Sequence, residues 1–215
     1  MFRVLVLLSA LMLSACASYT RDYEQRLVKS LPNQRDVTFA DQKTYPGQVL
    51  CGQYTALIGN GFSTRTRPFV VTEERVMESP TDDETAVYCT RNAAAALYER
   101  TGIGPDGDDW TALRAVFADM QAIDAAITAY YNRNAALPTS LEQILGASDS
   151  VTDDTLRDPW GSPYVYRGGL SGRTVPSYEL HTLGSDGADG GRGSAADIHV
   201  EILPLLGHVL ELATP

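Results

Sequence analysis

The residues between Asp109 and Arg133 carry the strongest periodic pattern in the chain. Apolar side chains recur there at steps of three and four residues, which places them on one face of an α-helix. Those positions are Leu113, Val116, Phe117, Met120, Ile123, Ile127, Tyr130 and Tyr131. Either Asp108 or Asp109 can cap the first turn of this helix, because a short acidic side chain accepts hydrogen bonds from free backbone N–H groups. A helix with one apolar face must pack against a second layer, so this segment requires a partner element.

Three segments after this helix have the pattern of short strands. Tyr164 to Arg167 and Tyr178 to Leu183 are rich in aromatic and apolar residues and are bounded by turns. Residues 197–202 alternate apolar and polar side chains, with Ile198, Val200 and Ile202 on the apolar side. Such segments are typical of half-buried strands. Together with the helix they predict one helix over a small antiparallel sheet.

Two shorter segments accompany that sheet. Thr139 and Glu142 have the spacing of a capping box, which predicts a short helix over residues 141–145. The tail from Leu203 to Leu212 is rich in leucine. Its side chains are expected to pack on the core, whereas an exposed apolar stripe there would dock a partner.

The residues before the long helix form a smaller module of different character. Strands are predicted at residues 37–39, 49–56 and 67–71, because these runs are apolar and are separated by Gly- and Pro-containing turns. A short helix is predicted over residues 93–98, and the Gly-rich run 102–107 has the composition of a linker. The chain therefore divides into a strand-rich module at 37–104 and a helix-and-sheet module at 105–215.

The N-terminus has the features of an export signal. Arg3 supplies a positive charge, residues 4–13 are apolar, and Leu13-Ser14-Ala15-Cys16 follows. The apolar run is shorter than the roughly 20 residues of a membrane-spanning helix, so residues 1–15 are predicted to be a signal peptide. Leu13 to Cys16 resembles the bacterial lipobox, which implies a mature protein lipidated at Cys16, with residues 16–36 as a tether. The alternative is an ordinary secretory peptide with an incidental cysteine.

The expected location and partners of the protein follow from this export signal and from the net charge of the chain. Ala17 stands where many lipoproteins of the inner membrane have Asp, so the resemblance implies the outer membrane, with the protein facing the periplasm or the cell surface. Several acyl chains anchor a protein firmly, because each buried methylene contributes about 0.8 kcal/mol. The net charge of −10 opposes binding to nucleic acid, which requires Lys and Arg to neutralise phosphates. The membrane and a protein of the envelope are the expected partners.

Cys51 and Cys89 are the two cysteines that remain once Cys16 is assigned to lipid. The periplasm is oxidising, so we expect these two to form a disulfide that contributes roughly 3–4 kcal/mol. Two buried thiols are the alternative. A zinc site is less well supported, because neither cysteine has a neighbouring Cys or His at ligand spacing.

Four motifs of the second module occur in the order found in a known family. The motifs are Leu137-Pro138-Thr139 after the helix, Asp158-Pro159-Trp160-Gly161, the run from Tyr178 to Gly187, and Ala196-Asp197-Ile198. Over about residues 115–200 the chain resembles the major pseudopilin of type II secretion systems. The resemblance implies an α+β fold with a C-terminal pilin-like module, one long helix over a small antiparallel sheet, preceded here by a strand-rich disulfide-bonded module.

In that family a glycine-rich loop of the head binds calcium, which the resemblance implies for residues 183–197. The candidate ligands are the carbonyl of Leu183 and the carboxylates of Asp186, Asp189 and Asp197. Calcium takes 6–8 oxygen ligands, and glycines let backbone carbonyls turn inward. Arg192, however, places a cation within the loop. The alternative is a plain polar turn in which Asp and Gly serve only the backbone.

The N-terminal half departs from the same family. A pseudopilin begins with a prepilin-peptidase site and a long apolar helix that polymerises, whereas this chain has a lipobox and a cysteine-containing module. We therefore do not expect it to act as a filament subunit.

Enzyme motifs are missing from the sequence. It contains no Gly-x-Ser-x-Gly elbow, Walker loop or His-Glu-x-x-His motif. His181 and His199 can meet across adjacent strands, and a metal pair there is conceivable, but satisfied or solvated histidines are the simpler expectation. We predict a non-catalytic, lipid-anchored protein with a calcium-stabilised head that acts by binding in envelope assembly or secretion. The alternative is a periplasmic hydrolase or ligand-binding protein that uses the head as a scaffold.

Overall fold

A computed structural model describes residues 19–31, 34–58, 65–107, 109–146, 150–169 and 177–213 of the chain. The chain divides into two compact units, Met1–Ala93 and Ala94–Pro215, and each is considered separately. The predicted signal peptide and Cys16 lie outside the described residues. Within the described ranges, no helix has both the length and the apolar character needed to cross a membrane.

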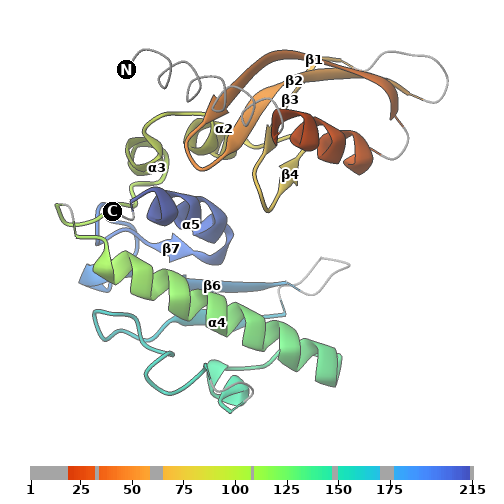
Figure 1. Ribbon diagram of the computed structural model, residues 1–215. Coiled ribbons are helices and arrows are strands. Elements are labelled where there is room, and N and C mark those ends of the chain that lie inside the picture. The colour runs from red at the N-terminus through yellow and green to blue at the C-terminus, as the bar shows by residue number, and fades with distance from the viewer. Residues whose placement is uncertain are drawn as a thin grey trace, which may run out of the picture. The chain divides into compact units, whose positions relative to one another are not determined.

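The first unit contains a four-stranded antiparallel sheet in the order β1-β2-β3-β4 (Figure 1). Its strands are β1 (Gln34–Tyr45), β2 (Val49–Ile58), β3 (Arg67–Val71) and β4 (Val76–Met77). The sequence pattern predicts β2 and β3 but only the centre of β1. The register of β1 against β2 shifts twice, and Asp36 and Asp41 in the shifted stretches have positive φ angles of 50° and 53°. Such irregularities break the two-residue alternation by which a strand is recognised.

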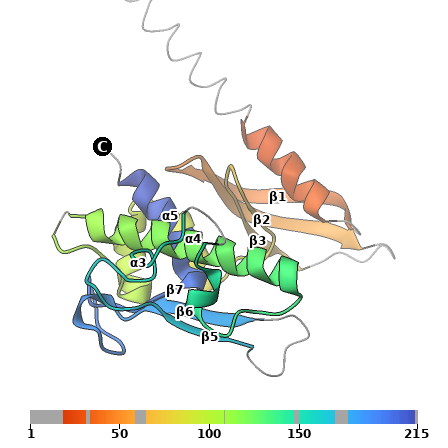
Figure 2. The ribbon, with the colours of Figure 1, turned by 90° about the horizontal axis from the view of Figure 1, so that it is seen from below.

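A helix over residues 19–30 packs on this sheet. Tyr23, Leu27 and Leu31 lie four residues apart and belong to a buried cluster with Leu50 and Phe69 of the sheet. Figure 2 shows the helix lying along the face formed by β1, β2 and β3. The assignment of residues 16–36 to a tether is therefore wrong for this stretch. Its apolar residues recur at helical spacing and belong to the core of the first unit.

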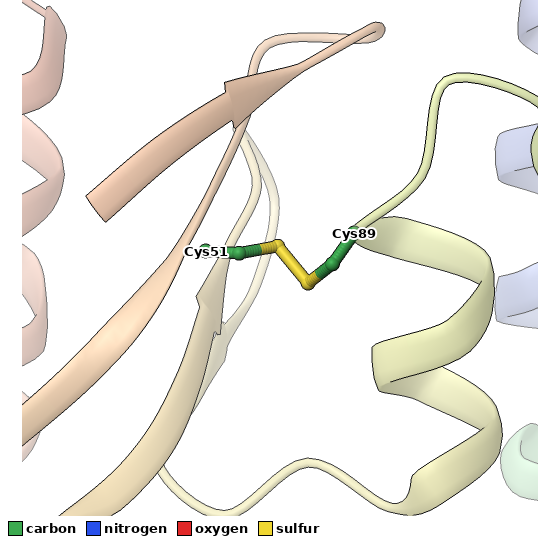
Figure 3. The surroundings of a disulfide bond; sticks show 2 residues. All are labelled: Cys51 and Cys89. Atoms are coloured by element: carbon green, nitrogen blue, oxygen red, sulfur yellow. A yellow bond between two sulfur atoms is a disulfide. The ribbon is translucent and has the colours of Figure 1, made fainter. Parts of the chain in front are cut away.

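The predicted pairing of Cys51 and Cys89 is confirmed. The disulfide joins β2 to the end of α2 (Asp82–Tyr88), as Figure 3 shows. The helix begins with a capping box, in which the Thr81 hydroxyl accepts from the Glu84 N–H and the Glu84 carboxylate accepts from the Thr81 N–H. The disulfide thus ties a helix with a defined start to the middle of the sheet.

The second unit packs one long helix on a three-stranded antiparallel sheet, as predicted. The helix is α4 (Thr111–Asn134), and the sheet has the order β5-β6-β7. Its strands are β5 (Val165–Gly168), β6 (Tyr178–Thr182) and β7 (Ile198–His199). The apolar stripe of α4 is buried, and Figure 1 shows the helix lying over β6. The buried residues of the helix are Leu113, Val116, Met120, Ile123, Ala126 and Ile127.

The start of α4 also follows the prediction in part. Trp110 occupies the N-cap position and makes no capping hydrogen bond with its side chain. The carboxylate of Asp109 instead accepts from the Thr111 N–H at 2.9 Å, so it still satisfies a free donor of the first turn.

The third predicted strand is only partly correct. Residues 197–202 are predicted as one strand, but β7 ends at His199 and a 3-10 turn, η3 (Val200–Ile202), follows. The turn leads directly into α5 (Leu203–Leu212), which has Pro204 in its first turn, where proline is tolerated. Four leucines of this tail are buried, as expected for packing on the core, and Leu212 at its end is exposed; the buried four are Leu203, Leu205, Leu206 and Leu210. The alternation over 198–202 therefore reflects a turn between a short strand and a helix.

The predicted capping box at Thr139 is wrong. The short helix is a 3-10 turn, η1 (Leu141–Ile144), and Ser140 occupies its N-cap position without a capping bond from its side chain. The Thr139 N–H donates instead to the Gln143 side chain at 2.8 Å. A 3-10 turn is too short to present the N–H groups that a capping box requires.

The predicted linker after α3 (Ala93–Thr101) packs within the second unit. Gly102, Ile103 and Gly104 are buried. The Gly193 N–H donates to the Gly102 carbonyl at 2.8 Å, and Ile103 forms a bridge with Gly193. This stretch is therefore fastened to the glycine-rich loop of the same unit.

We predict that the disulfide stabilises the first unit by about 4 kcal/mol, because it closes a loop with a sequence separation of 38 residues. The double variant Cys51→Ser/Cys89→Ser should lower the urea midpoint of this unit, measured by circular dichroism. Both tryptophans, Trp110 and Trp160, lie in the second unit, so their fluorescence transition is an internal reference. An unchanged midpoint, or a fall confined to the tryptophan signal, would contradict this assignment.

Candidate functional site

A buried carboxylate organises the turn before β5. Asp158 is only 4% exposed. Its Oδ1 accepts from the N–H groups of Trp160 and Ser162 at 3.1 and 2.9 Å, and its Oδ2 accepts from the Thr182 hydroxyl at 2.6 Å. A buried charge is costly unless hydrogen bonds replace its water, and three donors do so here. The turn is thereby linked to the end of β6.

The same threonine fixes the start of the glycine-rich loop, residues 183–197. The Thr182 hydroxyl donates to Asp158 and accepts from the Gly184 N–H at 3.1 Å. Gly184 begins a 3-10 turn, η2 (Gly184–Asp186), with φ of 65°. A Cβ at this position would lie 2.6 Å from the backbone carbon of Ala195. Only glycine permits both the positive φ and this close approach of the loop's two ends.

Asp197 holds the centre of the loop. Its Oδ2 accepts from the Gly190 N–H at 2.9 Å, and its own N–H donates to the Gly190 carbonyl at 3.2 Å. The other carboxylate oxygen, Oδ1, is buried and has no hydrogen-bond partner in the described part of the chain. Buried acceptors are nearly always satisfied, so this oxygen is suited to a cation or an ordered water.

The other predicted calcium ligands are less tightly placed. Leu183 occupies the N-cap position of η2, and Asp186 and Asp189 are exposed. Asp186 accepts from the Ala188 N–H at 3.1 Å through Oδ1. Across the described residues, the loop's three carboxylates do not gather into a cluster that holds an ion by itself. An ion in the loop would therefore need backbone carbonyls in addition to Asp197.

The Arg192 side chain contacts Tyr98 of α3. Its guanidinium donates to the Tyr98 carbonyl at 3.2 Å and lies 4.7 Å from the centroid of the Tyr98 ring. A cation near the end of a helix interacts favourably with the helix dipole and, here, with an aromatic face. The positive charge that would oppose an ion in the loop is thus engaged with Tyr98.

The sheet brings together a second group of residues, only part of which is evident from the sequence. His181 and His199 are cross-strand partners, and their rings stack with centroids 4.6 Å apart. Burial lowers the pKa of His181, and the neighbouring His199 lowers it further. Glu179 adds a carboxylate beside them, with Oε1 3.3 Å from His181 Nδ1. Glu179 could have been found from the sequence, because residues two apart on a strand, such as Glu179 and His181, project from the same face of the sheet.

A surface pocket of about 400 Å³ lies in the same unit. Its walls come from residues 139–142 and from Asp153, Leu156, Arg157, Pro163, Tyr164 and Tyr166. Among the described residues that line it there is no histidine or cysteine. The titratable groups that the pocket offers are thus carboxylates, Arg157 and tyrosines.

One long helix on an antiparallel sheet, with a glycine-rich loop after the middle strand, defines the second unit as a pilin-like module. A family model described as type II secretion system (T2SS), protein G, matches residues 108–201. The type II secretion system core protein G of Pseudomonas aeruginosa is 33% identical over 94 residues, which cover 37% of this chain and 64% of that protein. The second unit is thus a pseudopilin-like module, and the resemblance seen in its motifs is confirmed.

These matches have a defined extent. The family model covers a segment that lies wholly within the second unit. The chain spans slightly less than two thirds of the length of the Pseudomonas protein. The similarity therefore describes the head module, and the first unit is additional to it.

We predict that the loop requires glycine at position 191 because of packing. A Cβ on Gly191 would lie 2.1 Å from the Ala195 carbonyl oxygen, whereas Gly190 has a similar positive φ and nothing within 4 Å. Gly191→Ala should destabilise the second unit by about 1–3 kcal/mol more than Gly190→Ala, as measured by tryptophan fluorescence in urea. Equal effects of the two substitutions would show that the loop does not close as described.

Proposed function

We propose that this chain is a lipid-anchored protein of the cell envelope whose second unit is a non-catalytic, pseudopilin-like head that acts by binding, in type II secretion or a related assembly. The observation that carries the proposal is the match to core protein G over residues 108–201. The first unit is separately folded and disulfide-bonded, which favours an oxidising compartment. This unit precedes the head in sequence, where a pseudopilin has its polymerising helix. We therefore do not propose that this chain is a filament subunit.

The proposed anchor is an acylated Cys16. Tyr19, the first described helical residue, follows three positions later, and three residues span at most about 11 Å. Because Tyr23 and Leu27 of that helix are in the core, acylation would hold the first unit next to the bilayer. Ala17 favours the outer membrane, as argued from the sequence.

The proposed ion is calcium, held in the glycine-rich loop by Asp197 and the Leu183 carbonyl, with Asp186 and Asp189 as further candidates. The unpartnered Oδ1 of Asp197 supports this assignment, as does the engagement of Arg192 with Tyr98. Calcium would supply a charge that binds the loop's oxygens together and stabilises one loop conformation. The protein's own contribution is the glycine backbone that lets the carbonyls approach.

A hydrolase built on the head is not favoured. The pseudopilin family is structural, and the pocket of the second unit has no histidine or cysteine among its described lining residues. The proposed role is therefore to present a stable surface to an envelope partner.

We predict that Cys16→Ser abolishes membrane attachment. In bacteria that express the full chain, the wild type should incorporate labelled palmitate and partition into the detergent phase. The variant should do neither, because it lacks the thiol that accepts the lipid. Cys51→Ser/Cys89→Ser is the matched control and should keep its label. Labelling of the Cys16 variant would contradict the proposed anchor.

We predict that millimolar calcium raises the unfolding temperature of the second unit and that a chelator reverses the shift, because a ligand of the folded state stabilises it. Tryptophan fluorescence of the full chain in detergent reports this unit. Asp197→Asn should remove most of the shift. Asp154→Asn, which changes an exposed carboxylate of the same unit, should keep it. If calcium does not change the unfolding temperature of the wild type, the proposed calcium site is wrong, although the pseudopilin-like fold of the second unit still holds.

A further inference from the structure

We propose that Glu179, His181 and His199 form a binding site for a divalent transition-metal ion of the Zn²⁺ type, separate from the glycine-rich loop. The proposal goes beyond the calcium site and the anchor and depends on neither. These three are the described residues whose ligand atoms gather closely enough to share an ion, with all ligand atoms within 4.8 Å of one another.

The strand geometry explains why the three side chains meet. Glu179 and His181 are two residues apart on β6, so their side chains project from the same face of the sheet. His199 is the direct partner of His181 on β7. Opposed residues on antiparallel strands have Cβ atoms about 4.5–5.5 Å apart, which suits ligands of one ion.

The site lies on the face of the sheet that is turned away from α4. The Tyr178 hydroxyl donates to the carboxylate of Asp124 on α4, so Tyr178 lies on the helix-covered face. Because side chains alternate along a strand, Glu179 and His181 lie on the opposite face. Thr182, which fixes the glycine-rich loop, belongs to the helix-covered face. The proposed ion is thus on the other side of the sheet from the Asp158–Thr182 hydrogen bond.

His181 has a buried ring nitrogen that the described residues leave without a hydrogen bond. The residue is 6% exposed, and its Nδ1 has no hydrogen-bond partner among the described residues. Glu179 Oε1 is 3.3 Å from this nitrogen but does not satisfy it with hydrogen-bond geometry. A buried ring nitrogen without a donor or acceptor is uncommon, and coordination to a metal would satisfy it.

The ligand set selects the class of ion. Two imidazole nitrogens and one carboxylate are typical of zinc sites that keep a fourth position for water or another ligand. Calcium is disfavoured here, since it prefers six or more oxygen ligands. Ligand atoms around tetrahedral zinc are about 3.3 Å apart. The observed spread of up to 4.8 Å would therefore close by small rotations of side chains.

One neighbouring cation competes for the carboxylate. Arg167 of β5 is opposite Glu179 in register, with its guanidinium nitrogen 3.5 Å from Glu179 Oε2. The Arg167 side chain is 70% exposed, and exposed ion pairs of this kind contribute little to stability. An ion can therefore displace Arg167 from Glu179 at small cost.

The test is a calorimetric titration of the untagged full chain, in detergent at pH 7.5, with Zn²⁺. A second titration with Co²⁺, measured by its visible absorption, reports whether the ligands are tetrahedral. We expect one ion per chain. His199→Asn and Glu179→Gln should each weaken binding about tenfold or more, because loss of a mere outer-shell partner of a metal already costs about 10–100-fold. Arg167→Gln should bind as tightly as the wild type or more tightly. His208→Gln, which changes a histidine outside the cluster, should leave the affinity unchanged.

Two results would overturn the proposal. One is a wild-type affinity no greater than that of His199→Asn, with both proteins folded by circular dichroism. The other is an equal loss of binding in His208→Gln, which would show nonspecific capture by histidine. His199 is less buried than His181, so the His199 variant keeps the test valid if His181→Ala does not fold. A calcium-dependent rise in unfolding temperature that survives in His199→Asn would show that the two ions occupy different sites.

Discussion

The second unit depends on one buried carboxylate and the hydroxyl beside it. The Asp158 side chain is buried, and two backbone N–H groups and the Thr182 hydroxyl supply the hydrogen bonds that replace its water. The same hydroxyl accepts from Gly184, so the turn before β5, the end of β6 and the start of the glycine-rich loop share one hydrogen-bonded chain. In a low-dielectric setting such chains are stronger than isolated bonds and favour one arrangement. The loop is therefore held by the core of the unit at Gly184, its second residue, without the help of an ion.

The two units are stabilised by different interactions, and different roles are proposed for them. In the first unit a buried cluster packs the helix over 19–30 on a bulged sheet, and a disulfide ties α2 to the same sheet. This unit follows directly on the proposed lipid anchor. The second unit is the pseudopilin-like module, in which α4 covers one face of the sheet. The opposite face carries Glu179, His181 and His199. In the proposed function, attachment belongs to the first unit and recognition to the second.

Long periodic segments could be predicted from the sequence, whereas features set by neighbouring elements could not. The apolar stripe of α4, the strand β6 and the disulfide were evident, because each is a local pattern or a simple count. The helix over 19–30 lies in a segment assigned to a tether, and its burial could not be predicted, since burial depends on a sheet formed by later residues. The alternation after His199 was misleading because Pro204 starts α5 immediately. In the loop, the candidate ligands came from a family resemblance. The part played by Arg192 depends on Tyr98, 94 residues away in sequence.

The central claim is that the Asp158–Thr182 hydrogen bond positions the glycine-rich loop. The most direct test is amide hydrogen exchange of the full chain in Thr182→Val, which keeps the shape of the side chain and removes its hydroxyl. The account predicts faster exchange across residues 183–197 and unchanged protection in the middle of α4, because only the loop loses its attachment. Unchanged exchange in the loop would contradict the claim. So would a uniform loss of protection over the whole unit, since the hydroxyl would then serve general stability and not the position of the loop.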